Sequence, residues 1–312
     1  MKAIEISNLS KSYRTGFWQK NFKTALKNLN LEVEEGEVFG CLGPNGAGKT
    51  TTLKLLMGLV FPTSGTMKIL GRDAYDPAVK AILGFLPEQP YFYDYLTPME
   101  LLEYYAQLSG VDAKHRRRRA EETLAHVGLS SAATTQLRKF SKGMLQRVGI
   151  AQAILHDPKI VFLDEPMSGL DPIGRREIRD LIQELHDQGK TVFFSTHILS
   201  DAESLCDRVG VLNHGELRGV AVVPELVAKA SGFMELIWTG GKNAKESIHA
   251  LGGECRIAGE TMRATVTEPK LHQALEALRV AGCNLISVNP VRHTVEDFFM
   301  EKLETPSVGG NV

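Results

Sequence analysis

A single stretch of the chain decides the fold: Val38-Phe39-Gly40-Cys41-Leu42-Gly43-Pro44-Asn45-Gly46-Ala47-Gly48-Lys49-Thr50-Thr51. Its apolar opening, residues 38–42, predicts a buried parallel strand. A helical pattern follows over residues 51–57, and Gly58 ends it. Between the strand and the helix, residues 43–50 match GxxxxGKS/T at every fixed position, which predicts a phosphate-binding loop.

Each residue type in this loop has its own chemical reason. Glycines let the backbone curl so that successive N–H groups point at one anion. The helix that starts near Gly48 adds its positive N-terminal end. Lys49 supplies a mobile positive charge for the β- and γ-phosphates, and Thr50 offers a hydroxyl to Mg²⁺. We therefore expect ATP and Mg²⁺ here, contacted by Gly43, Pro44, Asn45, Gly46, Ala47, Gly48, Lys49, Thr50 and Thr51.

Two acids follow a second apolar strand. Residues 160–163 run directly into Asp164 and Glu165. Ligands of α/β sheets bind at the carboxyl ends of the strands, where Asp164 is expected. We expect Asp164 to hold the metal ion and Glu165 to act as the base for an attacking water.

Short apolar runs alternate with helical patterns from residue 1 to about 220. Residues 192–194 predict a further buried strand, and residues 174–187 predict a helix. The alternation predicts an α/β fold with a central parallel sheet, and the phosphate loop makes it a P-loop NTPase. Residues 98–152 show almost no strand pattern, so an all-helical insertion is expected there.

The pattern changes after residue 220. Residues 233–238, 254–257, 262–266 and 285–288 predict strands, and residues 245–251 and 269–280 predict helices. The order β-α-β-β-α-β matches the ferredoxin-like arrangement. We expect a nucleotide-binding domain over 1–220, a small α+β domain over 221–304 and a flexible tail over 305–312.

Composition excludes several other classes of protein. The formal net charge is only −1, so bulk electrostatics do not favour nucleic-acid binding. The four cysteines lie far apart without a CxxC pair, which favours a reducing, cytoplasmic compartment. The N-terminus lacks the apolar core of a secretory signal, and the apolar stretches are too short to span a bilayer.

Further segments resemble one family of P-loop ATPases. Phe140-Ser141-Lys142-Gly143-Met144-Leu145-Gln146-Arg147 resembles the ABC signature segment, usually LSGGQ, and Ser168-Gly169-Leu170-Asp171 resembles the family's D-loop. His197 resembles its switch histidine, and Tyr13 the aromatic residue that stacks on adenine. The resemblance covers residues 1–220 and implies a RecA-like core, an antiparallel β subdomain and a helical insertion. The SKGM form of the signature, residues 84–88 (GFLPE) and residues 295–299 (VEDFF) resemble ATPase subunits of ABC-2 type exporters.

The resemblance also implies roles for individual residues. Ser141, Lys142, Gly143 and Met144 would bind the γ-phosphate held by a second copy, Asp171 of the D-loop would also be a nucleotide-binding residue, and His197 would contact the γ-phosphate. Lys142 departs from the usual glycine, and its charge lies either beside the phosphate or on the nearby surface. Glu88 and Gln89 are rival residues for the Q-loop role at the metal or the water, while Phe17 and Trp18 are rivals of Tyr13.

The expected function is therefore ATP hydrolysis in an ATP-bound homodimer that drives a separate transmembrane permease in export. Such a subunit would be cytoplasmic and peripheral on the inner face of the cell membrane. The alternatives are a non-transport ABC ATPase of nucleic-acid repair or translation, and a nucleotide-dependent binding module. The first would carry a long coiled coil, a second cassette or zinc-binding cysteines, and Glu165 with His197 argues against the second. The basic run of residues 114–119 is interpreted as a solvated helix face more readily than as a lipid or partner contact.

Overall fold

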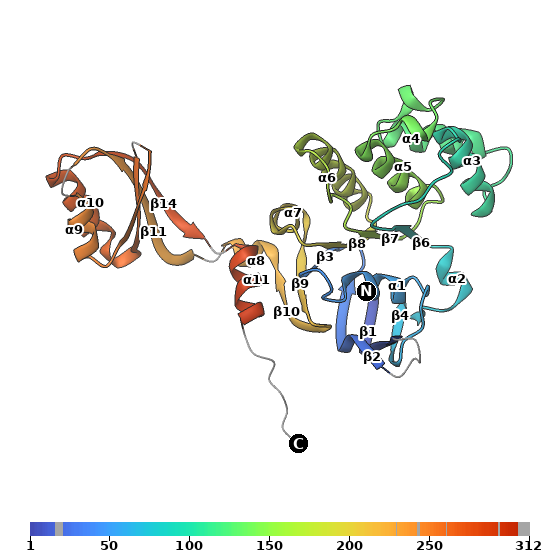
Figure 1. Ribbon diagram of the computed structural model, residues 1–312, viewed down its shortest axis with the longest axis horizontal. Helices are drawn as coiled ribbons and strands as arrows, with labels where there is room; N and C mark the ends of the chain where they lie inside the picture. Colours follow the sequence, from blue (N-terminus) through green and yellow to red (C-terminus); the bar gives the residue numbers. More distant parts are fainter. Residues whose placement is uncertain (16–20, 229, 242–243, 260, 293, 305–312) are drawn as a thin grey trace, which may run out of the picture. The chain divides into compact units, whose positions relative to one another are not determined.

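The central sheet of the chain has six strands, in the order β10-β9-β3-β8-β7-β6 (Figure 1). Strands β9, β3, β8, β7 and β6 pair in parallel, and β10 pairs antiparallel with β9. Their bounds are β3 Val38–Leu42, β6 Leu83–Leu86, β7 Ile160–Asp164, β8 Thr191–Thr196, β9 Arg208–Asn213 and β10 Glu216–Val222. Every residue of β3, β7 and β8 is buried, which fits the short apolar runs that mark these strands in the sequence at residues 38–42, 160–163 and 192–194. The predicted parallel sheet is confirmed.

The computed structural model describes residues 1–15, 21–228, 230–241, 244–259, 261–292 and 294–304. The chain separates into two units: one consists of Met1–Val223 together with the chain from Phe299 onward, and the other of Pro224–Phe298. None of the helices within these described ranges combines the length and apolarity needed to cross a bilayer.

A second sheet in the first unit is antiparallel, in the order β2-β1-β4-β5. It consists of β1 Lys2–Thr15, β2 Asn21–Glu34, β4 Ser64–Ile69 and β5 Arg72–Asp73. Buried side chains of this sheet, such as Ile4 and Leu29, pack in one hydrophobic cluster with Phe39 of the central sheet and Leu53 of α1 (Lys49–Leu56). The antiparallel sheet therefore shares the core that supports the phosphate loop.

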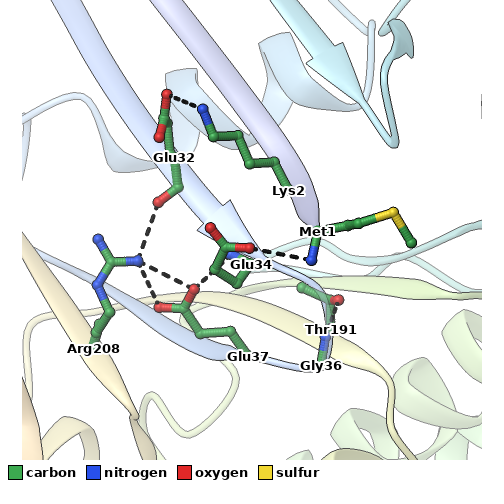
Figure 2. A network of polar contacts seen from close by, with 8 residues as sticks. All are labelled: Met1, Lys2, Glu32, Glu34, Gly36, Glu37, Thr191 and Arg208. Carbon is green, nitrogen blue, oxygen red and sulfur yellow. Dashed lines mark hydrogen bonds and ion pairs between the residues drawn. The ribbon is translucent and has the colours of Figure 1, made fainter.

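Charged groups join the antiparallel sheet to the central sheet where β3 and β9 begin (Figure 2). The buried Glu37 carboxylate accepts hydrogen bonds from Arg208 Nη1 at 3.1 and 3.2 Å and from the Glu34 N–H at 2.7 Å. Burial raises the pKa of Glu37, although the Glu34 amide and Arg208 oppose the shift. Since Arg208 Nη1 also donates to the Glu32 carbonyl at 3.3 Å, β2 and β9 are held together around one carboxylate.

The segment between β6 and β7, where the helical insertion was predicted, consists of helices joined by loops and turns. The helices are α3 Pro98–Leu108, α4 Arg116–His126, the short 3₁₀ turns η1 Ser130–Ala132 and η2 Leu137–Lys139, and α5 Lys142–Ile154. A capping box of Thr97 and Glu100 starts α3. In α4, Arg117 and Arg118 form ion pairs with the glutamates four residues later, which fits the solvated-face interpretation of the basic run.

The remaining helices of the first unit are α2 Pro77–Lys80, α6 Pro172–Asp187 and α7 Leu199–Leu205, and α8 Val223–Ala228 begins at its boundary. In the second unit the elements are β11 Ala230–Thr239, α9 Ala244–Ala250, β12 Glu254–Ala258, β13 Thr261–Thr267, η3 Glu268–Lys270, α10 Leu271–Val280 and β14 Asn284–Arg292. The last helix, α11 Val295–Glu304, crosses the boundary after Phe298.

The second unit has its own antiparallel sheet, in the order β12-β13-β11-β14. Strand β13 lies between β11 and β12, so the β11-α9-β12 unit is split by the strand that follows it. Trp238, Leu236, Ile248 and Leu278 form a separate buried cluster between the sheet and its helices. The predicted ferredoxin-like order is confirmed, with the difference that the second helix starts as a 3₁₀ turn around Pro269.

Candidate functional site

The phosphate loop lies between β3 and α1, and its backbone requires glycine. Gly48 has a φ of +112°, in a region that side chains disfavour. A Cβ on Gly48 would also lie 2.7 Å from the Ala25 carbonyl oxygen and 2.7 Å from Leu26 Cδ2. Gly46 has a φ of +80°. The left-handed turns at these two positions close the loop before α1 begins at Lys49, two residues earlier than the sequence pattern predicts.

Lys49 is enclosed by this loop. Its side chain is only 6% exposed, and Nζ donates hydrogen bonds to the Gly43 carbonyl at 2.7 Å and the Pro44 carbonyl at 3.4 Å. Nζ also lies 3.2 Å from Glu165 Oε1. The buried ammonium is thus placed between the loop backbone and the second of the two acids that end β7.

Asp164, the first of the two acids, contacts the loop through Thr50. The Thr50 hydroxyl donates to Asp164 Oδ1 at 3.2 Å, and the Ser195 hydroxyl donates to the same oxygen at 2.6 Å. A hydroxyl and a carboxylate beside a phosphate loop are the hard oxygen donors that Mg²⁺ prefers. The donor set therefore fits the metal that the sequence predicts.

Glu165 lies next to Asp164 in a strained backbone conformation. Its φ is +50°, which is unusual for a residue with a side chain. Its N–H donates to the Ser195 hydroxyl oxygen at 2.9 Å, and its Oε2 lies 2.8 Å from His197 Nδ1. Glu165 is 7% exposed, whereas the His197 side chain is 46% exposed. The carboxylate is thereby fixed between a buried ammonium and an accessible imidazole.

One cavity of about 480 Å³ collects most of these groups. It is lined by Tyr13, Lys23, Thr24, Ala25, Asn45, Gly46, Ala47, Gly48, Lys49, Thr50, Thr51, Glu88, Glu165, Ser168 and His197. Gly43, Pro44 and Asp164 are predicted site residues that do not line it, but Lys49 and Thr50 hydrogen-bond to them from inside.

One of the two rival assignments separates in the structure. Glu88 lines the cavity and Gln89 is not among its lining residues. Tyr13 lines it from β1, and Lys11 Nζ lies 4.9 Å from the centre of its ring. The rivals Phe17 and Trp18 lie outside the described residues.

The signature residues do not reach this cavity. Ser141, Lys142 and Gly143 line a second cavity of about 410 Å³, together with Arg147, Gly169, Leu170, Asp171, Ile173, Gly174 and Glu177. Ser141 accepts a hydrogen bond from the Met144 N–H at 3.2 Å, and Asp171 accepts one from the Gly174 N–H at 2.9 Å. Both residues therefore cap helices within their own chain.

Several residues of the site were not predicted from the sequence. Lys23, Thr24 and Ala25 reach the cavity through the pairing of β1 with β2, where Tyr13 lies opposite Lys23. No local motif marks them. Ser195 had a weak signal, because it and Thr196 are hydroxyl residues at the end of an otherwise apolar strand.

Asp201, four residues after His197, is a further buried acid near the site. It is 2% exposed, and its Oδ2 has no hydrogen-bond partner among the described residues. Burial raises the pKa of Asp201, and the guanidiniums of Arg175 and Arg179 on α6 oppose that shift. Below the loop, burial raises the pKa of Cys41 to about 12, so this thiol stays protonated.

Comparison with known proteins adds independent support. A family model described as ABC transporter matches residues 26–168. An uncharacterised ABC transporter ATP-binding protein of Synechocystis is 42% identical over 96% of this chain and 84% of its own length. The bacitracin transport ATP-binding protein BcrA of Enterococcus faecalis is 38% identical over 95% of this chain and 94% of its own length.

Among solved structures, the dimeric ATP-binding cassette MJ0796 bound to ADP and Pi is similar, with a TM-score of 0.65 and 30% identity over 70% of this chain and 98% of its own. The phosphate loop, the acid-tipped strand and the extent of these similarities lead to one assignment. The chain belongs to the ABC transporter family, among its ATP-binding proteins.

Proposed function

We propose that the chain binds ATP at the phosphate loop and hydrolyses it, with Glu165 as the general base. The observation that carries this proposal is the set of contacts around Glu165, which lies 3.2 Å from Lys49 Nζ and 2.8 Å from His197 Nδ1. A carboxylate fixed in this way can take a proton from a water at the γ-phosphate. His197 orients Glu165 and, being exposed to the cavity, can contact the same phosphate.

Mg²⁺ would be held by Thr50 and Asp164, with Glu88 as a further oxygen donor from the cavity wall. Bound there, the ion would neutralise charge on the β- and γ-phosphates. The Ser195 hydroxyl directs Asp164 Oδ1 by its 2.6 Å hydrogen bond. Tyr13, at the outer wall of the cavity, would stack on the adenine ring.

The second cavity supports pairing of two copies. It places Ser141 and Gly143 at the N-terminus of α5, where an anion is favoured, yet its lining residues are distinct from those of the first cavity. A second copy would bring its own phosphate loop, with ATP, to this position. The similar cassette MJ0796 is described as dimeric. ATP would then hold two copies together until hydrolysis releases them.

The association and release of the two copies would drive a transmembrane permease, which the chain would contact at the inner face of the membrane. Exposed aromatic side chains follow directly after the cavity residue Glu88, namely Tyr91 at 91%, Tyr93 at 48% and Tyr95 at 60% exposure. They lead into α3 of the helical segment, which carries the exposed Leu108. Export is the direction that the resemblance to ABC-2 type exporters implies, and two similar proteins are named bacitracin transport ATP-binding proteins.

The experiment is ATP hydrolysis by the purified chain with Mg²⁺, alone and with its permease in lipid vesicles. The wild type should turn over ATP, and Glu165→Gln should abolish turnover, retain ATP binding and accumulate as a dimer in ATP. Full turnover by Glu165→Gln would remove Glu165 from the role of base. Stimulation by nucleic acid and none by the permease would instead favour the repair or translation class.

A further inference from the structure

Lys142 is the residue at which the signature departs from its usual form, and its position breaks a local rule. It is the first residue of α5, directly after the capping residue Ser141. The N-terminal end of a helix carries partial positive charge, so a cation there is unfavourable by roughly 0.3–1 kcal/mol at an exposed position. Residues that violate a local preference are expected at functional sites.

The structure shows where the Lys142 side chain lies. It passes over Gly169 of the D-loop, because a Cβ built on Gly169 would collide with the Lys142 ammonium and lie 3.4 Å from Lys142 Cε and 3.8 Å from Cδ. Gly169 has a φ of +69°. The glycine thus makes room above all for the ammonium end of the lysine, and the two residues fit one another although they are far apart in the sequence.

The D-loop connects the two cavities through one peptide bond. Ser168 lines the cavity of the phosphate loop, whereas Gly169 lines the cavity of the signature. The segment is a compact turn, since the Ser168 N–H donates to the Glu165 carbonyl at 3.1 Å. A shift of Gly169 would therefore be transmitted to Ser168 and to the strained residue Glu165.

We propose that Lys142 is a positioning residue, which holds Gly169 and thereby the turn from Glu165 to Ser168 in the hydrolytic site of its own chain. The inference rests on the proposed role of Glu165. In this proposal Lys142 connects two sites of one chain. One is the anion site at the start of α5, which serves the ATP of the partner copy, and the other is Glu165, which serves the ATP of the chain itself.

The test replaces Lys142 by Met, which keeps a long apolar stem, by Gly, the usual residue, and by Glu. All three variants should lower kcat by about fivefold or more, since small displacements of a catalytic group have effects of this size. The KM for ATP should stay within about twofold, because the phosphate loop is unchanged. For Lys142→Met and Lys142→Glu, thermal stability should stay equal or rise, most for Lys142→Glu, because the unfavourable charge at the helix end is removed. For Lys142→Gly the flexibility of glycine in a helix offsets this gain, so that variant is compared by kcat and KM.

Lys139→Met is the matched control, since Lys139 is an exposed lysine three residues earlier on the same segment. It should leave both kcat and stability unchanged. A merely structural role of Lys142 would lower stability and activity together. Wild-type kcat in Lys142→Met and Lys142→Gly would overturn the inference, whereas an inactive wild type would instead overturn the proposed ATPase.

A double-mutant cycle tests the contact itself. Gly169→Ala places a methyl group where the Lys142 ammonium lies, in addition to straining the backbone. In the Lys142→Gly background only the backbone strain remains, so Gly169→Ala should lower kcat less than it does in the wild type. Strictly additive effects on kcat would show that the two side-chain positions act independently and would contradict the proposal.

Discussion

His197 Nδ1 lies 2.8 Å from Glu165 Oε2, and this pair joins the end of β8 to the end of β7 at the exposed mouth of the cavity. The imidazole contacts one oxygen of the carboxylate, Oε2, whereas Lys49 Nζ contacts the other, Oε1. We predict that His197→Ala lowers kcat by about a hundredfold or more while ATP binding persists, because a general base depends on its orientation. Steady-state hydrolysis and equilibrium nucleotide binding measure the two effects.

The matched control for that variant is His249→Ala, an exposed histidine in the second unit. It should hydrolyse ATP at the wild-type rate. Equal losses in the two variants, or a His197→Ala enzyme that no longer binds ATP, would contradict an orienting role for His197.

Ser195 serves both acids with one hydroxyl, which donates to Asp164 and accepts from the Glu165 N–H. We predict that Ser195→Ala lowers the free energy of unfolding by about 1–3 kcal/mol, because two buried polar groups lose their partner. It should also lower kcat, since both acids become less fixed. Chemical denaturation and ATP hydrolysis measure the two losses.

Thr191→Val provides the comparison for Ser195→Ala on the same strand. Thr191 is 3% exposed, and its hydroxyl accepts a hydrogen bond from the Gly36 N–H at 2.9 Å at the opposite end of β8. Its loss should lower stability and leave kcat unchanged. If both variants lost activity in proportion to stability, Ser195 would have no specific role in the site.

The sequence predicted those parts of the site that lie on local motifs. The phosphate loop, Asp164 and Glu165 each follow a buried strand, and parallel strands of one sheet bring their carboxyl ends to the same edge. The long strands β1 and β2 carry no such regular pattern. Their pairing contains several register shifts, and Asn8 and Asn28 have positive φ values, so a simple alternation of buried and exposed residues is interrupted.

Contacts between distant segments also escaped prediction. The position of the Lys142 side chain over Gly169 depends on how α5 packs beside the D-loop. Neither residue belongs to a hydrophobic pattern from which this contact could be predicted. The same holds for Lys23 and Ala25, which line the cavity only because β2 pairs with β1. Tertiary packing places these groups, and no spacing in the sequence encodes it.

Asp201 should give stability a pH dependence of known sign. Because burial raises the pKa of Asp201 above 3.8, its contribution favours the folded state at acid pH and is lost as the pH rises through the raised value. Relative to Asp201→Asn, the wild type should therefore become less stable as the pH increases above about 4. Denaturant unfolding of both proteins over a pH series measures this difference.

Asp157→Asn is the control with the opposite sign. The hydrogen bond from Lys190 lowers the pKa of Asp157, so the wild type should gain stability over Asp157→Asn as the pH rises through the range below 3.8. For each variant, the difference in the free energy of unfolding from the wild type is plotted against pH. If the differences for Asp201→Asn and Asp157→Asn changed with pH in the same direction, Asp201 would not titrate as a buried acid.

Lys49 and Glu165 are a buried ion pair, with side chains 6% and 8% exposed, and this links nucleotide binding to stability. Lys49→Met should lose most of its ATP affinity and also lower the free energy of unfolding by about 3–5 kcal/mol, because Glu165 is left as an uncompensated buried charge. Adding Glu165→Gln removes that charge, so the double variant should regain much of the stability but none of the ATP affinity. Nucleotide titration and denaturant unfolding separate the two effects. If the double variant stayed as unstable as Lys49→Met, the loss would come from the missing hydrogen bonds to the Gly43 and Pro44 carbonyls, and the charge pair would carry little of the stability.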